Sequence, residues 1–197
     1  MKTTGLILIL ALLCAMTCFA SPSKRVLTVA EDGYPTGYST PEGAACDLAR
    51  AFIRRDPSLF ESTCIRPFGG GQSRAKYEAF LKQTAASIAA EAKKTTPSAG
   101  GPTRIGKVFA ARHLTQSGPV SYGYAMFGFN DVEFVDVGVF LHDGSHVLNR
   151  TFVIQDSNGK WYVDPDPTVS PLLSAGLNDE MPSTADFSEA YSVKAAK

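Results

Sequence analysis

Apolar residues recur at helical spacing in the first half of the chain. Between Glu42 and Arg55 the residues at this spacing are Ala45, Leu48, Ala49 and Phe52, which predicts an amphipathic helix. Asp56-Pro57 ends that helix and opens a shorter one through Phe60, so the two form a hairpin. A longer helix is predicted from Arg74 to Lys93, where one face is formed by Tyr77, Phe80, Leu81, Ile88 and Ala92.

After Thr103 the pattern changes to runs of β-branched and aromatic residues separated by short turn signals. This pattern is typical of antiparallel strands, which we predict over 104–113, 119–129, 132–142, 146–156 and 160–164. The dipeptides Asn130-Asp131, Asp143-Gly144 and Asn158-Gly159 predict two-residue hairpin loops. Three helices followed by an antiparallel meander predict an α+β fold, with a helix hairpin and one long helix packed on the sheet.

Two-residue loops fix strand register and therefore sort the side chains of the sheet into two faces. The face expected to meet the helices is mostly large and apolar, with Val135, Val137, Val139, Leu148, Phe152, Ile154, Trp161 and Val163. Its polar members are Tyr122, Tyr124, Glu133 and Arg150. Few polar groups on an apolar surface are typical of a small-molecule pocket, so these four residues are the candidate ligand-binding set. The alternative is structural, with Glu133 at the sheet edge, Arg150 paired to a carboxylate and both tyrosines in the core.

The opposite face of the predicted sheet carries four phenylalanines, Phe127, Phe129, Phe134 and Phe140. Such a face is too apolar to be left in water, so we predict that it packs against a second copy of the chain or another partner. The alternative cover is the segment 21–41 or the C-terminal segment. Asn149-Arg150-Thr151 is a glycosylation sequon on this predicted face, and a glycan there would argue against a dimer.

The chain begins with Lys2, an uncharged apolar run and small residues at Cys18 and Ala20, as a secretory signal peptide does. We therefore predict a signal peptide over 1–20, a secreted or periplasmic protein, an N-terminal arm over 21–41, a domain over 42–167 and a C-terminal tail over 168–197. The apolar run is shorter than the roughly 20 residues of a membrane-spanning helix, so no membrane span is expected.

Two of the four cysteines, Cys46 and Cys64, remain after the predicted signal peptide. In an oxidising compartment they form a disulfide or stay as two small buried side chains. Both lie about equally far from the turn of the helix hairpin, which favours the disulfide.

Charge and histidine content exclude several classes of function. Lys plus Arg and Asp plus Glu number 19 each, so the chain lacks the basic surface typical of nucleic-acid binding. His142 and His146 flank a turn and alternate to opposite faces, and His113 is the remaining histidine, so no metal site and no cofactor are predicted. The glycines before the long helix lack the Lys-Ser/Thr of a nucleotide-binding loop.

The order of elements from Glu42 to Pro165, with "LARAFIRRDPSLFES" and the closing "NGKWYV", resembles the nuclear transport factor 2-like (NTF2-like, SnoaL-like, cystatin-like) superfamily. The resemblance implies a curved sheet that forms a cone around the long helix, with a ligand or active site at its mouth. Its members include isomerases, dehydratases, cyclases and binding domains, so the fold alone does not give the function.

The function predicted from these patterns is an exported small-ligand-binding or accessory module without catalysis, in which Arg150 pairs with an anionic group of the ligand. One alternative is an isomerase, dehydratase or cyclase with Glu133 as base and Tyr122 or Tyr124 beside it. The other is a protein-interaction scaffold that uses the outer face of the sheet.

Overall fold

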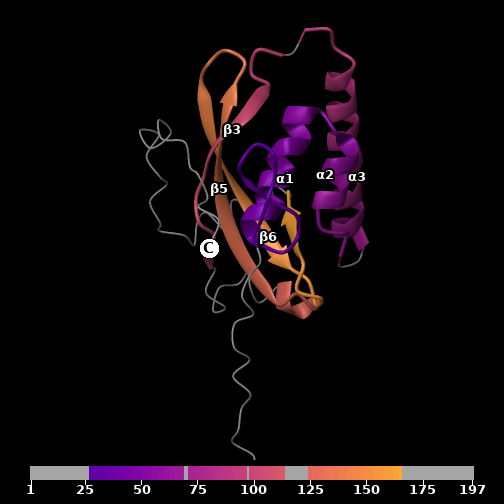
Figure 1. Ribbon diagram of the computed structural model, residues 1–197. Helices are drawn as coiled ribbons and strands as arrows, with labels where there is room; N and C mark the ends of the chain where they lie inside the picture. Colours follow the sequence, from indigo (N-terminus) through magenta and orange to yellow (C-terminus); the bar gives the residue numbers. More distant parts are fainter. Residues whose placement is uncertain (1–26, 69–70, 97, 114–123, 166–197) are drawn as a thin grey trace, which may run out of the picture.

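The chain folds as an α+β domain, with three helices on one side of an antiparallel sheet (Figure 1). The computed structural model describes residues 27–68, 71–96, 98–113 and 124–165. The helices are α1 (Pro41–Arg54), α2 (Pro57–Thr63) and α3 (Gly71–Ala92). The strands are β1 (Thr28–Val29), β2 (Pro35–Thr36), β3 (Pro102–Val108), β4 (Arg112–His113), β5 (Asp131–Leu141), β6 (His146–Gln155) and β7 (Trp161–Asp164). The predicted fold class is confirmed.

The helix hairpin begins and turns where the sequence predicts it. Thr40 caps α1 by accepting a hydrogen bond from the Gly43 amide at 3.0 Å, and a proline follows the cap. Asp56 caps α2 in the same way through the amides of Ser58 and Leu59. Between the helices, Arg55 has a φ of 54°, the left-handed conformation that closes a helix C-terminus.

The sheet has the order β3-β5-β6-β7, and β4 also pairs with β5. The strand predicted at 119–129 is therefore wrong where the structure describes it, because 124–126 form a helical turn. β5 pairs with β3 and β4 instead, so the predicted Asn130-Asp131 hairpin is also wrong. Figure 1 shows β5 and β6 as the long curved strands of this sheet.

Both remaining hairpins have three-residue loops rather than the predicted two. The Leu141 amide donates to the Ser145 carbonyl, and the Asp156 amide donates to the Lys160 carbonyl. In each loop the last residue is a glycine with positive φ, 82° at Gly144 and 79° at Gly159, as in a type I turn followed by a bulge.

The extra loop residue moves every side chain of β6 to the face opposite the one predicted, because side chains alternate along a strand. Arg150 lies opposite Asp136, and Thr151 lies opposite Val135. The register between β6 and β7 also differs by one residue from the predicted register. This second shift returns the side chains of β7 to the faces predicted for them. Trp161 and Val163 consequently lie on the predicted inner face.

The main core lies between α1 and the inner face of the sheet. It consists of Tyr34, Ala44, Ala45, Cys46, Ile105, Val108, Val135, Val137, Val139, Val153, Trp161 and Val163. A second cluster joins the three helices around Phe60, and a third surrounds Tyr77 and Tyr124. No helix in the described ranges is long and apolar enough to cross a membrane.

The described part of the N-terminal arm is a hairpin fastened to α1 by Arg50, which is 2% exposed. Its guanidinium donates to both carboxylate oxygens of Asp32, to Asp47 and to the carbonyls of Tyr34 and Pro35. All five N–H groups of the arginine are thereby satisfied. Asp47 also accepts hydrogen bonds from the Thr36 hydroxyl and the Gly37 amide.

The close contact between this hairpin and α1 requires glycine at position 43. A Cβ atom there would lie 2.4 Å from the Gly37 carbonyl oxygen. We expect Gly43→Ala to lower the free energy of unfolding by about 1–3 kcal/mol, as overpacking does, in urea titrations followed by circular dichroism. Gly100→Ala is the control, because nothing lies within 4 Å of a Cβ at Gly100. Equal stability of both variants and the unmodified protein would contradict this packing.

Candidate functional site

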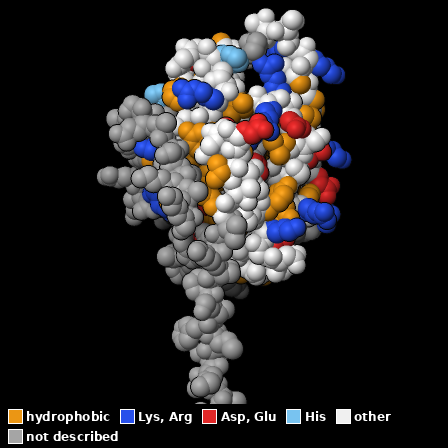
Figure 2. Space-filling view, viewed as in Figure 1, with side chains coloured by type: hydrophobic (Ala, Val, Ile, Leu, Met, Phe, Trp, Pro, Cys, Tyr) orange, Lys and Arg blue, Asp and Glu red, His pale blue; other side chains and the backbone are white. Residues whose placement is uncertain are grey.

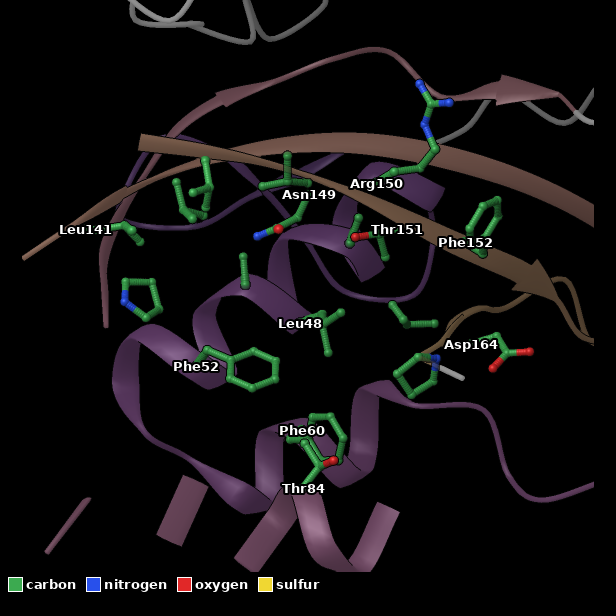
Figure 3. A pocket seen from close by; sticks show the side chains of 18 of the residues that line it. Leu48, Phe52, Phe60, Thr84, Leu141, Asn149, Arg150, Thr151, Phe152 and Asp164 are labelled. Carbon is green, nitrogen blue, oxygen red and sulfur yellow. The ribbon is translucent and has the colours of Figure 1, made fainter. Parts of the chain in front are cut away.

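A pocket of about 440 Å³ lies between the helices and the inner face of the sheet (Figure 3). Its walls are mainly apolar and include Leu48, Phe52, Phe60, Phe80, Val137, Val139, Leu141, Val147 and Val163. α1, α2 and α3 supply one wall, while β5, β6 and β7 supply the other. Volume and lining are typical of a site for a small apolar molecule.

Three neutral polar side chains line this apolar pocket. Asn149 and Thr151 come from the inner face of β6, and Thr84 comes from α3. Figure 3 shows Asn149 and Thr151 on the side of β6 that faces the helices. Thr151 is 6% exposed, whereas Asn149 is exposed. In the described ranges no side chain of these three makes a hydrogen bond, so each has donors and acceptors available to a ligand.

The guanidinium of Arg150, the predicted anion-binding residue, points away from the helices (Figure 3). Its guanidinium donates two hydrogen bonds of 2.9 Å to the two carboxylate oxygens of Asp136 on the outer face. Arg112 contacts the same carboxylate at 3.3 Å, and both arginines lie over the Phe134 ring. The side chains of Arg150 and Asp136 are 13% and 1% exposed. Arg150 is among the residues that line the pocket, but the shifted register turns its guanidinium outward to Asp136, so the structure does not support its predicted role in binding an anion.

Of the other three residues predicted for the pocket, the two that the structure describes are not among the residues that line it. Glu133 is buried on β5, opposite Val153, and does not belong to the residues that line the pocket. Tyr122 lies outside the described residues. Tyr124 is buried in the aromatic cluster, and its hydroxyl donates to Asp164. Asp164 lines one end of the pocket, although the sequence pattern assigned it only to the end of the last strand.

The predicted disulfide is not formed, since Cys46 and Cys64 are both free and buried. Cys46 faces the sheet in the main core, whereas Cys64 packs with Phe60 between the helices. The helix hairpin brings the two residues to one end but directs their side chains into different clusters. Burial raises the pKa of both thiols.

The predicted outer surface of four phenylalanines is not a single surface. Phe127 and Phe129 pack around Phe68 with Tyr124, at ring distances of 5.2 and 5.1 Å from Phe68. Phe134 is buried, and the guanidinium of Arg104 lies 3.8 Å from the centre of the Phe140 ring. These four residues therefore do not form the single surface predicted, and packing against a second copy of the chain stays a prediction.

No group of three or more potential metal ligands occurs in the part of the chain that the structure describes. The charged side chains shown in Figure 2 have both signs and lie mostly over the helical side of the molecule. The apolar pocket and its neutral polar groups are consequently the feature with the clearest chemical specificity.

No protein-family model and no curated protein matches this chain. Among solved structures, it is similar to a crystal structure from Campylobacter jejuni described as an NTF2-like transpeptidase. The TM-score is 0.42 and the sequence identity 17%, with 63% of this chain and 96% of that chain covered. Likeness at this level does not assign the chain to a family.

Proposed function

We propose that this chain is an exported binding module of NTF2-like type that holds a small, largely apolar molecule between its helices and its sheet. The observation that supports it is the pocket of about 440 Å³ with apolar walls and the polar side chains of Asn149, Thr151 and Thr84. Apolar walls provide affinity, and a few polar groups orient the ligand. These three polar groups differ from the four predicted from the sequence, of which Arg150 also lines the pocket.

Export is proposed from the signal-peptide pattern of residues 1–20, with Cys18 and Ala20 as its small residues. N-terminal sequencing of the protein recovered after expression with its own leader tests this proposal. A first residue of Ser21 supports it, whereas an intact Lys2 on exported or retained protein contradicts it.

A second candidate function, an enzyme, is favoured by the hydrogen bond between Tyr124 and Asp164. A carboxylate at the end of an apolar pocket, held by a tyrosine hydroxyl, is an arrangement that general acid–base catalysis uses. Asp164 therefore replaces Glu133 as the candidate base, because Asp164 lines the pocket and Glu133 does not. The other polar groups of the pocket are neutral and suit ligand binding without a reaction, so binding remains the first proposal.

One screen separates the two functions. The protein without residues 1–20 is incubated with a steroid, a fatty acid and an aromatic acid, and each mixture is examined by thermal shift and by mass spectrometry for new products. We expect a rise in melting temperature with at least one compound and no product. A product that disappears in Asp164→Asn would establish the enzyme instead, and the absence of any thermal shift or product across the panel contradicts both.

A further inference from the structure

The pocket adjoins a second cavity of about 250 Å³, in which a larger share of the lining residues have polar or charged side chains. The two cavities share Phe52, Thr84, Gly100 and Pro102 in their walls, so they adjoin along α1 and α3. The second cavity adds Arg55, Ser87, Ile88, Glu91, Ser98, Gly101 and His142. Together they form one groove with an apolar half under the sheet and a polar half beside the tip of the β5–β6 hairpin.

Phe52 lies where the two halves meet. Its ring packs edge-on against Phe60 at 5.8 Å, yet 39% of the residue is exposed. It is one of the few large hydrophobic residues left open to solvent in the described ranges. Phe52 therefore continues the apolar surface of the groove up to its polar half. A ligand with an apolar chain and a polar head would contact both halves.

The charges of the polar half are not equally compensated. The Glu91 carboxylate accepts hydrogen bonds from Lys94 and from the Ser98 hydroxyl, the latter at 2.9 Å. The guanidinium of Arg55 makes one long hydrogen bond, 3.4 Å from Nη1 to the Glu91 carbonyl oxygen, and no other in the described part of the chain, although its charge also acts on the Glu91 carboxylate. Since a guanidinium has five N–H groups, most of its donors remain available at the wall of the cavity.

The position of Arg55 is fixed by the fold. It is the residue with a φ of 54° that ends α1, directly before the Asp56 cap of α2, so the helix hairpin places its Cα at the edge of the groove. Its partly buried location strengthens an interaction with an anion relative to one in bulk water.

We infer that the ligand is an amphipathic carboxylate, with an alkyl or aryl part in the apolar half and its carboxylate at Arg55. This inference rests on the proposed binding function. The guanidinium matches a carboxylate through two parallel hydrogen bonds. Arg55 thereby takes the role predicted for Arg150, which is to pair with an anionic group of the ligand.

The test compares three probes with a ten-carbon chain: decanoate, decanol and decyltrimethylammonium. Isothermal titration is performed with the protein lacking residues 1–20 and with two variants, Arg55→Gln and Arg54→Gln. Arg54 is the matched control, because it is exposed in the last turn of the same helix and does not line the groove. Glutamine keeps the length and shape of the side chain while removing the charge.

We expect decanoate to bind roughly tenfold more tightly than decanol, as one charge-assisted hydrogen-bonded pair provides. Arg55→Gln removes this preference, so that decanoate and decanol bind with similar affinity, whereas Arg54→Gln keeps the tenfold preference. Equal binding of decanoate and decanol by the unmodified protein, or a preference for decyltrimethylammonium, overturns the assignment of Arg55 but keeps the binding pocket. Failure of all three probes to bind contradicts the pocket proposal itself and this inference with it.

Discussion

Replacing Arg50 with alanine is expected to lower the free energy of unfolding by about 3–5 kcal/mol, the usual cost of removing one partner of a buried ion pair. The variant leaves Asp47, whose side chain is 11% exposed, without its cation. It also removes the hydrogen bonds that Arg50 donates to the buried Tyr34 and Pro35 carbonyls, of which the Tyr34 carbonyl keeps the one from the Ala30 amide. Urea titration followed by circular dichroism measures the loss.

Arg54→Ala is the control for this prediction, because Arg54 lies on the same helix but is exposed. Its expected effect is about 0.5 kcal/mol or less. A loss of less than about 1 kcal/mol in Arg50→Ala would show that the hairpin contributes little to stability.

The same network gives the stability a dependence on pH. Burial raises the pKa of Asp32, but hydrogen bonds from Arg50 and the Tyr34 amide outweigh it, so the folded-state pKa lies below the ordinary 3.8. The unfolded state therefore binds protons first as the pH falls, and this contribution is present above pH 3.8 and lost below it. Arg50→Ala should flatten this part of the stability profile.

Thr84→Trp is expected to abolish ligand binding without unfolding the protein. Thr84 is half-buried on α3 and lines both halves of the groove, so an indole there occupies the space of the ligand. Filling an apolar cavity commonly preserves or raises stability. The melting temperature should therefore stay the same or rise, while titration with the best-binding probe of the panel gives no heat of binding.

The control for this variant is Gln83→Trp, which adds the same indole at the adjacent, exposed position of α3. It should bind the probe as the unmodified protein does. Binding that survives in Thr84→Trp with a raised melting temperature would show that the ligand uses another surface.

The helices could be predicted from the sequence because their signals are local. Thr40, Asp56 and the prolines that follow them define the starts of α1 and α2 whatever the rest of the chain does. The N-terminal hairpin could not be predicted from the sequence, because it is stabilised by ion pairs of Arg50 with Asp32 and Asp47 and has no periodic pattern.

The site could be predicted only in part because it depends on strand register. Asp143-Gly144 fits a two-residue loop or a three-residue loop that ends in glycine, and one residue decides which face of β6 meets the helices. The Asp143 side chain, which accepts from the Ser145 amide and hydroxyl, stabilises the longer loop. An alternative register with Asn149 and Thr151 inward was open to sequence reasoning, and the pairing of Arg150 with Asp136 would have favoured it.

The measurement that tests the account most directly is nuclear magnetic resonance of methyl-labelled protein saturated with decanoate. The binding site predicts intermolecular nuclear Overhauser effects from the alkyl chain to the methyl groups of Leu48, Val139 and Thr151, which line the pocket. Leu148, on the outer face of β6, should show none. Contacts to Leu148, or saturable binding without contacts to the three pocket residues, would contradict ligand binding in this pocket.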